Sequence, residues 1–301
     1  YPVNYWIVDY DEMNELIAYG GFQSRYPHWR WGMTYDRQQK QGQFLGGKAF
    51  EIVNNDNPAH AFLQVSNSLA DQKAVITHVE AHSDFFSNNE WFGMFSSDPD
   101  AAARLARHAE TIREYMQDPE IERAAVEKWI DHVLCLEDNI DQHRPYAPLD
   151  FADGEPEIDT EELTDQLGDL ELSEEVRQQV FDDEWLEAQR EDDDATTFPA
   201  EPERDILSFL RKHGKRYDPD AEKAVEMEEW QKEILEILRT EAYYFAPQKM
   251  TKVMNEGWAS YWESLMMAGE NFADADEFIT YADHMSKVLG SGGLNPYSLG
   301  L

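Results

Sequence analysis

The chain has 301 residues, enough for one large domain or two modest ones with a substantial core. Its 62 Asp and Glu residues against 25 Lys and Arg give a net charge of -37, while 42% of the residues are hydrophobic. A field of that sign repels polyanions, and the cations are scattered along the chain. The composition therefore argues against binding to nucleic acid or to an anionic membrane surface.

The acidic residues are spread over the whole length, and only 11 of the 25 cations are Lys. This composition is typical of proteins that hydrated carboxylates keep soluble in a very salty cytoplasm, as in halophilic archaea. The alternative is an acidic mesophilic protein with one disordered acidic insert. The single cysteine, Cys135, cannot form an intrachain disulfide, and its apolar helical surroundings predict a core position. Apolar runs stay far below the roughly 18–20 residues that span a bilayer, so we expect a cytoplasmic protein.

The first half of the chain predicts a small sheet followed by helices. Residues 1–45 are rich in aromatics and glycine without a sustained period, which predicts ordered irregular structure. Two short β-prone runs, 48–54 and 60–67, flank an Asn-Asp-Asn-Pro turn and predict a hairpin. Apolar residues at three- and four-residue steps then predict helices over 69–86, 100–117 and 119–140.

The second half begins with an acidic stretch. Residues 151–205 contain 22 Asp or Glu against three Arg, which predicts a solvated insert with one possible docked leucine helix. Helical periodicity returns over 203–213, 226–245, 248–268 and 274–289. The aromatic residues at 26–35 and 258–262 are expected in the core; the alternative is a carbohydrate-binding platform. The sequence thus predicts an α+β protein, mostly helical with a small antiparallel sheet.

A histidine pair is the first candidate for chemistry. His78 and His82 lie four residues apart on a helical segment, so both imidazoles leave the same face and can share one metal ion. Nine histidines in 301 residues also produce such pairs by chance. A catalytic zinc ion takes three protein ligands and keeps one position open, so a third ligand is needed.

Glu256 is the candidate third ligand. It lies in the string Met254-Asn255-Glu256-Gly257-Trp258-Ala259, where small residues allow another helix to approach closely. Several gluzincin-type metallopeptidases use a Glu in a very similar string as third ligand. By that analogy His78, His82 and Glu256 converge on one ion; otherwise Glu256 is a surface carboxylate.

The general base is harder to place. A peptidase zincin has its base one residue after the first histidine, where this chain has Val79. Glu80 lies about 200° from His78 around the helix and points away from the pair. Glu51, on the preceding strand, is the substitute that we favour; the alternative is an ordinary cross-strand carboxylate.

These residues carry a family resemblance over nearly the whole chain. The chain resembles the stage V sporulation protein R (SpoVR) family. The matching motifs are Tyr26-Pro27-His28-Trp29 with Gly32, Ala49-Phe50-Glu51-Ile52-Val53-Asn54, Asn57-Pro58, His78 and His82 with Phe85-Phe86, Trp230 to Leu235, Tyr244 to Gln248, Met254 to Ala259, His284 and Asn295-Pro296-Tyr297. Residues 151–205 and about 214–227 have no clear counterpart. The resemblance therefore implies a single domain over 1–301 with two inserts.

The resemblance implies a sporulation or stress-response context. The family often occurs beside an AAA+ serine protein kinase and a von Willebrand-A-like protein, which makes these the implied partners. Two further histidines match or adjoin its motifs. His28 either lines the pocket or fills an aromatic corner, and His284 either contacts the substrate or simply packs on the last predicted helix.

Two functions follow from this sequence. The first is a zincin-like, metal-dependent hydrolase, with zinc on His78, His82 and Glu256, acting on peptide or cell-wall-type amide bonds. Glu51, His28 and His284 are its candidate catalytic residues. The second is a non-catalytic regulatory or scaffold protein that acts with the kinase. A fourth protein ligand would favour the second function, and an open ligand position in a cleft would favour the first.

Overall fold

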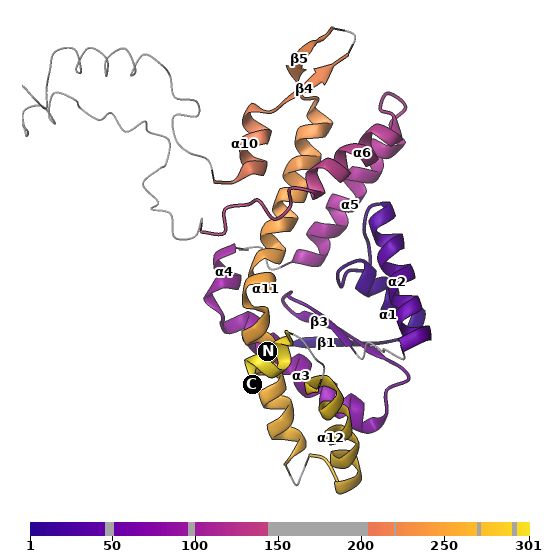
Figure 1. Ribbon diagram of the computed structural model, residues 1–301, viewed down its shortest axis with the longest axis vertical. Coiled ribbons are helices and arrows are strands. Elements are labelled where there is room, and N and C mark those ends of the chain that lie inside the picture. Colours follow the sequence, from indigo (N-terminus) through magenta and orange to yellow (C-terminus); the bar gives the residue numbers. More distant parts are fainter. Residues whose placement is uncertain (46–50, 96–99, 144–203, 220, 270–271, 291–293) are drawn as a thin grey trace, which may run out of the picture. The chain divides into compact units, whose positions relative to one another are not determined.

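The computed structural model describes residues 1–45, 51–95, 100–143, 204–219, 221–269, 272–290 and 294–301 (Figure 1). The chain divides into two compact units, Tyr1–Ile140 with Leu207–Leu301, and Asp141–Ile206. The first unit contains the larger sheet and the candidate site. The predicted insert at 151–205 lies outside the described residues except for Arg204 and Asp205, so its character stays a prediction.

The first 45 residues are more regular than the sequence predicts. They form strand β1 (Val3–Val8), helix α1 (Tyr10–Ala18) and helix α2 (Trp29–Leu45). Helix α1 starts at a capping box, in which the Asp9 carboxylate accepts from the Glu12 N–H and the Glu12 carboxylate accepts from the Asp9 N–H. The prediction of irregular structure was wrong because it relied on long-range periodicity and overlooked this local signal.

The larger sheet is mixed. The predicted hairpin is confirmed, because β2 (Glu51–Asn54) pairs antiparallel with β3 (Ala59–Gln64). Strand β1 adds to the other side of β3 in parallel, which gives the order β1-β3-β2 and corrects the expected antiparallel arrangement. A second hairpin, β4 (Lys215–Asp218) with β5 (Lys223–Glu226), occupies the region predicted as a short insert.

Helices make up most of the described chain, as predicted. The region after the sheet contains α3 (Leu69–Asn88), α4 (Glu90–Phe95), α5 (Ala101–Gln117), α6 (Arg123–Leu134) and α10 (Ile206–His213). Helix α3 begins at a capping box of Ser68 and Asp71. Helix α6 is shorter than the predicted 119–140, and Cys135 at its end is exposed rather than in the core.

Helix α11 (Glu229–Met267) is one helix where the sequence predicts two. The expected break, Pro247, lies inside it and is buried. The carbonyl of Pro247 accepts a hydrogen bond of 2.6 Å from the Thr251 hydroxyl. Helices α12 (Ala275–Leu289) and α13 (Pro296–Gly300) follow. Among the described helices, none is both long and apolar enough to cross a bilayer.

The two halves of α11 have different surroundings. The first half packs against α5 and α6 in the main apolar core, around Ile112, Ile130 and Ile234. The second half packs along α3 and α13 (Figure 1). Its outer face carries Trp258 at 38% and Tyr261 at 51% exposure, so the predicted core position of these aromatics was wrong.

Candidate functional site

Helix α3 presents its histidine pair to α11. His78 and His82 are both buried, and their rings lie 4.6 Å apart at 82° to each other. Glu80 is exposed on another face, where its carboxylate accepts a 2.7 Å hydrogen bond from the Tyr5 hydroxyl. The prediction that Glu80 points away from the pair is confirmed.

Glu256 of α11 meets both histidines at one oxygen. Its Oε2 lies 3.6 Å from Nε2 of His78 and 3.6 Å from Nε2 of His82. Within the described part of the chain, the side chains of these three residues form a group that could hold a metal ion. Ligand atoms about 2.0–2.2 Å from a tetrahedral ion lie roughly 3.4 Å from one another, close to the spacing found here.

Oε2 of Glu256 is also buried without a hydrogen bond to any of the described residues. Solvent does not reach this atom. A buried carboxylate oxygen with only 3.6 Å contacts to two imidazoles is costly, because such long contacts replace little of the hydration that it loses. A cation between Oε2 and the two Nε2 atoms would remove that cost, so the three residues fit a divalent metal.

Both imidazoles are anchored from behind through Nδ1. His78 Nδ1 lies 2.8 Å from Oε2 of Glu263, and His82 Nδ1 lies 2.8 Å from Oδ1 of Asn255. Because these oxygens accept hydrogen bonds, each Nδ1 carries the proton. In a neutral ring this leaves the Nε2 lone pair directed toward Glu256, which is the usual arrangement of metal-binding histidines.

A close helix crossing brings a tyrosine to the cluster. Gly257 of α11 touches Gly300 of α13, and a Cβ on Gly257 would lie 2.4 Å from the Gly300 carbonyl carbon. The small-residue prediction for this string is thereby confirmed. The crossing places Tyr297 beside His78, with ring centroids 6.0 Å apart. Burial and the charge of Glu256 raise the pKa of the Tyr297 hydroxyl above its usual value.

The charged groups of the cluster shift one another's pKa values. Burial alone would lower the pKa of His78, but the carboxylates of Glu256, Glu263 and Glu51 reverse this effect and raise the pKa to about 10. Burial and the charge of His78 lower the pKa of His82 to about 4. Burial acts to raise the pKa of Glu256, yet the neighbouring histidines hold it below the ordinary value. Without a metal, one proton on His78 supplies the positive charge.

Two cavities open onto the cluster. One of about 370 Å³ is lined by His78, His82 and Glu256, and one of about 330 Å³ is lined by His78 and Glu263. Glu51 and Tyr297 line both cavities. Burial raises the pKa of the Glu51 carboxyl to about 7. The structure therefore brings Glu51 to the cluster as a carboxyl that titrates near neutral pH.

The remaining predicted residues have different positions. His284 lines the second cavity, with Nδ1 3.6 Å from the Asp71 carboxylate, so it lies next to the cluster without joining it. His28 is placed elsewhere. Its Nε2 lies 3.1 Å from the Asp131 carboxylate, and its ring packs on Trp29 and Trp31. We therefore withdraw His28 from the candidate site, in favour of the aromatic-corner alternative.

Three contributors were missed from the sequence as parts of the site. Glu263 and Asn255 orient the histidines, and Tyr297 lines both cavities. A signal existed for Glu263, since it follows Glu256 by two helical turns and therefore lies on nearly the same face. Tyr297 becomes a neighbour only through the Gly257–Gly300 crossing.

Comparison with known proteins identifies the family of this chain. The family model described as SpoVR like protein matches residues 1–301. The chain belongs to the SpoVR family. It is 31% identical over 329 aligned residues to the uncharacterized protein YcgB of Escherichia coli (strain K12), a match that covers 100% of this chain and 58% of that relative. The chain thus spans well under two thirds of this relative's length. No solved structure matches the chain.

Proposed function

We propose that this SpoVR-family chain is a metal-dependent hydrolase with a zincin-like site. His78, His82 and Glu256 would hold one divalent ion, and their nitrogen and oxygen donors suit zinc. The observation that carries the proposal is the buried Oε2 of Glu256, which makes no hydrogen bond within the described residues and lies 3.6 Å from two Nε2 atoms. The Nδ1 anchors of Glu263 and Asn255 support it, because they orient both rings.

The cavity beside the cluster favours a catalytic over a closed structural site. Three protein donors would leave a four-coordinate ion one position for water or substrate, and the same three residues line the 370 Å³ cavity. When bound, the ion would polarise a substrate carbonyl and activate water. A peptide or cell-wall-type amide bond is the substrate bond that we propose.

Glu51 and Tyr297 would carry the protons of this reaction. As water attacks the carbonyl carbon, the Glu51 carboxylate accepts its proton, and the Tyr297 hydroxyl donates a hydrogen bond to the carbonyl oxygen. Glu51 then passes the proton to the amide nitrogen as the C–N bond breaks, which releases an acid and an amine. A carboxyl with a pKa of about 7 suits both steps near neutral pH.

Elemental analysis of protein purified without chelators tests the metal. We expect about one equivalent of a divalent metal, lost in His82→Ala and kept in His132→Ala, an exposed histidine that serves as control. Zinc, manganese, iron, cobalt and nickel all at background would refute the proposal.

Release of free amines from a labelled peptide mixture tests the reaction. Glu51→Gln should retain the metal and lose amine release. Retained metal without any hydrolysis by the intact protein would instead favour the alternative, a regulatory or scaffold protein.

The biological setting is also a proposal. We infer a cytoplasmic protein of a halophilic source from the charge of -37, and an AAA+ serine protein kinase and a von Willebrand-A-like protein as partners from the family. A cooperative melt that strengthens in molar KCl would support the first inference. Co-purification of both partners from the source cells would support the second, and their absence would refute it.

A further inference from the structure

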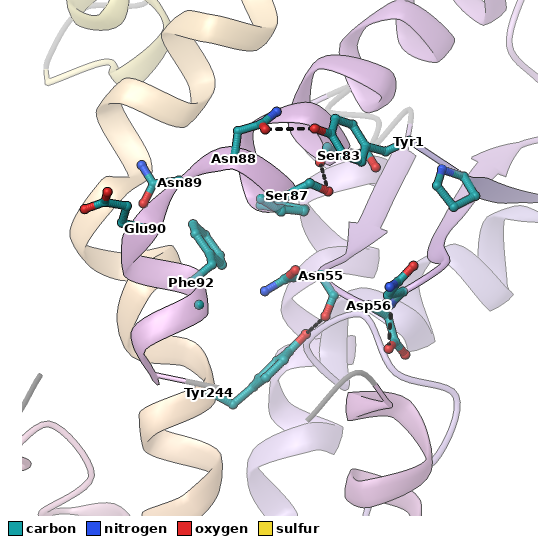
Figure 2. A pocket seen from close by; sticks show the side chains of 14 residues that line it. Tyr1, Asn55, Asp56, Ser83, Ser87, Asn88, Asn89, Glu90, Phe92 and Tyr244 are labelled. Carbon is teal, nitrogen blue, oxygen red and sulfur yellow. Dashed lines mark hydrogen bonds between the residues drawn. The ribbon is translucent and has the colours of Figure 1, made fainter. Parts of the chain in front are cut away.

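A larger cavity lies beside the candidate site, at the end of α3. It has a volume of about 590 Å³, within the usual range for small-molecule sites. Its walls are Tyr1 and Pro2, the last turns of α3, the turn between β2 and β3, helix α4 and Tyr244 of α11 (Figure 2). Neither the cluster nor the proposed reaction accounts for this cavity.

The charged side chains around the cavity disfavour an anionic ligand. Its lining contains no Lys or Arg among the described residues, and its two carboxylates belong to Asp56 and Glu90. The Asp56 carboxylate already accepts from the backbone N–H groups of Asn57, Ala101 and Ala102. Glu90 alone does not make a site for a cation, so the cavity suits an uncharged ligand.

The polar groups of the cavity are mostly neutral amides and hydroxyls. Asn55, Asn57, Asn88 and Asn89 line it together with Ser83 and Ser87. Each amide both donates and accepts hydrogen bonds, as does every hydroxyl of a sugar. The Asn55 amide points across the cavity toward Phe92, while its backbone carbonyl accepts a 2.8 Å hydrogen bond from Tyr244 (Figure 2).

Side chains, rather than a strand edge, dominate these walls. An extended peptide is commonly held by main-chain hydrogen bonds to an exposed strand. Here a helix end, a turn and a short helix offer side-chain amides around the ring of Phe86, which contacts the buried Phe92. An apolar ring among neutral hydrogen-bonding groups suits a sugar chain, which has apolar C–H faces and hydroxyl groups along its edges.

Phe86 connects this cavity to the cluster. It lines both the 590 Å³ cavity and the 370 Å³ cavity. Its ring stacks on His82 at 6.0 Å and 11°, and it contacts Phe92 with centroids 5.1 Å apart. Phe86 is therefore a wall shared by the two cavities, and it stacks directly on one of the histidines.

We propose that the cavity at the end of α3 binds an uncharged oligosaccharide, through Asn55, Ser87 and the ring of Phe86. Binding stands on the cavity alone. The further step, that this sugar chain is part of the substrate and extends past Phe86 to the cluster, rests on the proposed function.

Calorimetric titration of the intact protein tests binding. The probes are the tetrasaccharides of cellulose, starch and chitin, with tetra-alanine as the peptide probe. We expect at least one tetrasaccharide to bind. Asn55→Ala should weaken it about tenfold, because one hydrogen bond to the ligand is lost. Asn139→Ala, at an exposed asparagine outside the cavity, should bind like the intact protein.

A matched pair of glycines supplies a blocking variant and its control. Gly93 of α4 lines the cavity, Gly32 of α2 does not, and a Cβ added to either meets open space, so both variants should fold. Gly93→Trp should reduce binding more than tenfold, and Gly32→Trp should leave it unchanged. Binding that withstands Gly93→Trp, binding of tetra-alanine only, or no binding at all would overturn the proposal.

Glu256→Gln separates this proposal from the proposed function. The variant should lose the metal and still bind the sugar, since its carboxylate lies outside the larger cavity. If the intact protein binds the sugar but holds no metal, the hydrolase proposal fails and the binding site stands. If the intact protein holds the metal but does not bind the sugar, the sugar-binding proposal fails and the metal-site proposal stands.

Discussion

Helix α11 buries carboxylates in two clusters that differ in the charge facing them. Near its middle, Glu241 Oε2 lies 2.7 Å from Nη2 of Arg25, and Oε1 lies 3.3 Å from Nδ1 of His108. Further along, Glu256 faces the imidazoles of His78 and His82 at 3.6 Å, and the charge of Lys252 has a smaller influence on its pKa. Both carboxylates are fixed by the same helix, so the difference lies in their partners.

The partners decide whether the cluster is permanent or exchangeable. A guanidinium stays charged at any physiological pH, so Arg25 neutralises Glu241 and stabilises the main core. Burial opposes ionisation of Glu241, but Arg25 and His108 hold its pKa below the ordinary value. An imidazole can lose its proton and bind a metal instead. The comparison shows that one buried carboxylate faces a permanently charged guanidinium, whereas the other faces imidazoles whose charge can change.

Removing the permanent cation should have the largest effect. Arg25→Met leaves Glu241 buried without its main partner, which should cost about 3–5 kcal/mol in free energy of unfolding. Denaturant titration at fixed salt measures this loss. Arg30→Met is the control, because the Arg30–Glu137 pair is partly exposed at 39% and 27% and should contribute about 0–1 kcal/mol. Equal losses would mean that the Glu241 cluster is not a buried ion pair.

Removing the exchangeable carboxylate should change metal affinity rather than stability. Glu256→Gln loses an anionic ligand, so we expect metal affinity to fall by more than about 100-fold, beyond the range typical of outer-shell changes. The metal-free variant should melt near the metal-free parent. Glu80→Gln, on another face of α3, should change neither quantity. Competition with a fluorescent chelator measures the affinities, and similar losses in both variants would contradict the ligand assignment.

The carboxylate behind His78 should have a smaller effect on the same measurement. Glu263→Gln keeps an oxygen near Nδ1 but removes its charge, so metal affinity should fall roughly 10- to 100-fold. Asn255→Asp adds a charge behind His82 and should raise affinity. A change in the same direction for both variants would show that packing, and not charge, controls the site.

Glu51 has no permanent cation and should give the smallest effect, with a distinct pH dependence. Its folded pKa of about 7 lies above the ordinary 4.5, so the folded state binds a proton more tightly than the unfolded state does. Its ionisation therefore costs stability progressively as pH rises from 4.5 to 7. In metal-free protein, Glu51→Gln should be about 1–2 kcal/mol more stable than the parent at pH 5.5 and equal at pH 4. Melts at both pH values measure this, and a pH-independent difference would contradict the raised pKa.

The elements that could be predicted are those with a long apolar period or a clear turn. Helix α3 and the β2–β3 hairpin agree with the sequence because periodicity and the Asn-Asp-Asn-Pro turn act locally. Strand β1 could not be predicted, since its pairing partner lies more than 50 residues away in β3. Pro247 failed to end α11 because tertiary packing on both sides holds the helix together.

Some residues of the candidate site could likewise be predicted from local sequence, and others could not. The spacing of His78 and His82 follows from one helix turn, and the string around Glu256 identified the third member of the cluster. Glu263 and Asn255 act only because α11 lies along α3, which no local pattern describes. His28 shows the converse error, since its aromatic neighbours are the same in a packed corner as in a pocket.

The distance along the chain between the two halves of the cluster has a consequence for synthesis. His82 precedes its anchor Asn255 by 173 residues, so at roughly 5–20 residues per second the ribosome completes α3 about 10–35 s before the rest of the site exists. During that interval the nascent chain offers an ion two imidazoles and no Glu256. Stable metal uptake would therefore begin only after the second half of α11 has left the ribosome, which makes a loaded site a marker of a finished fold.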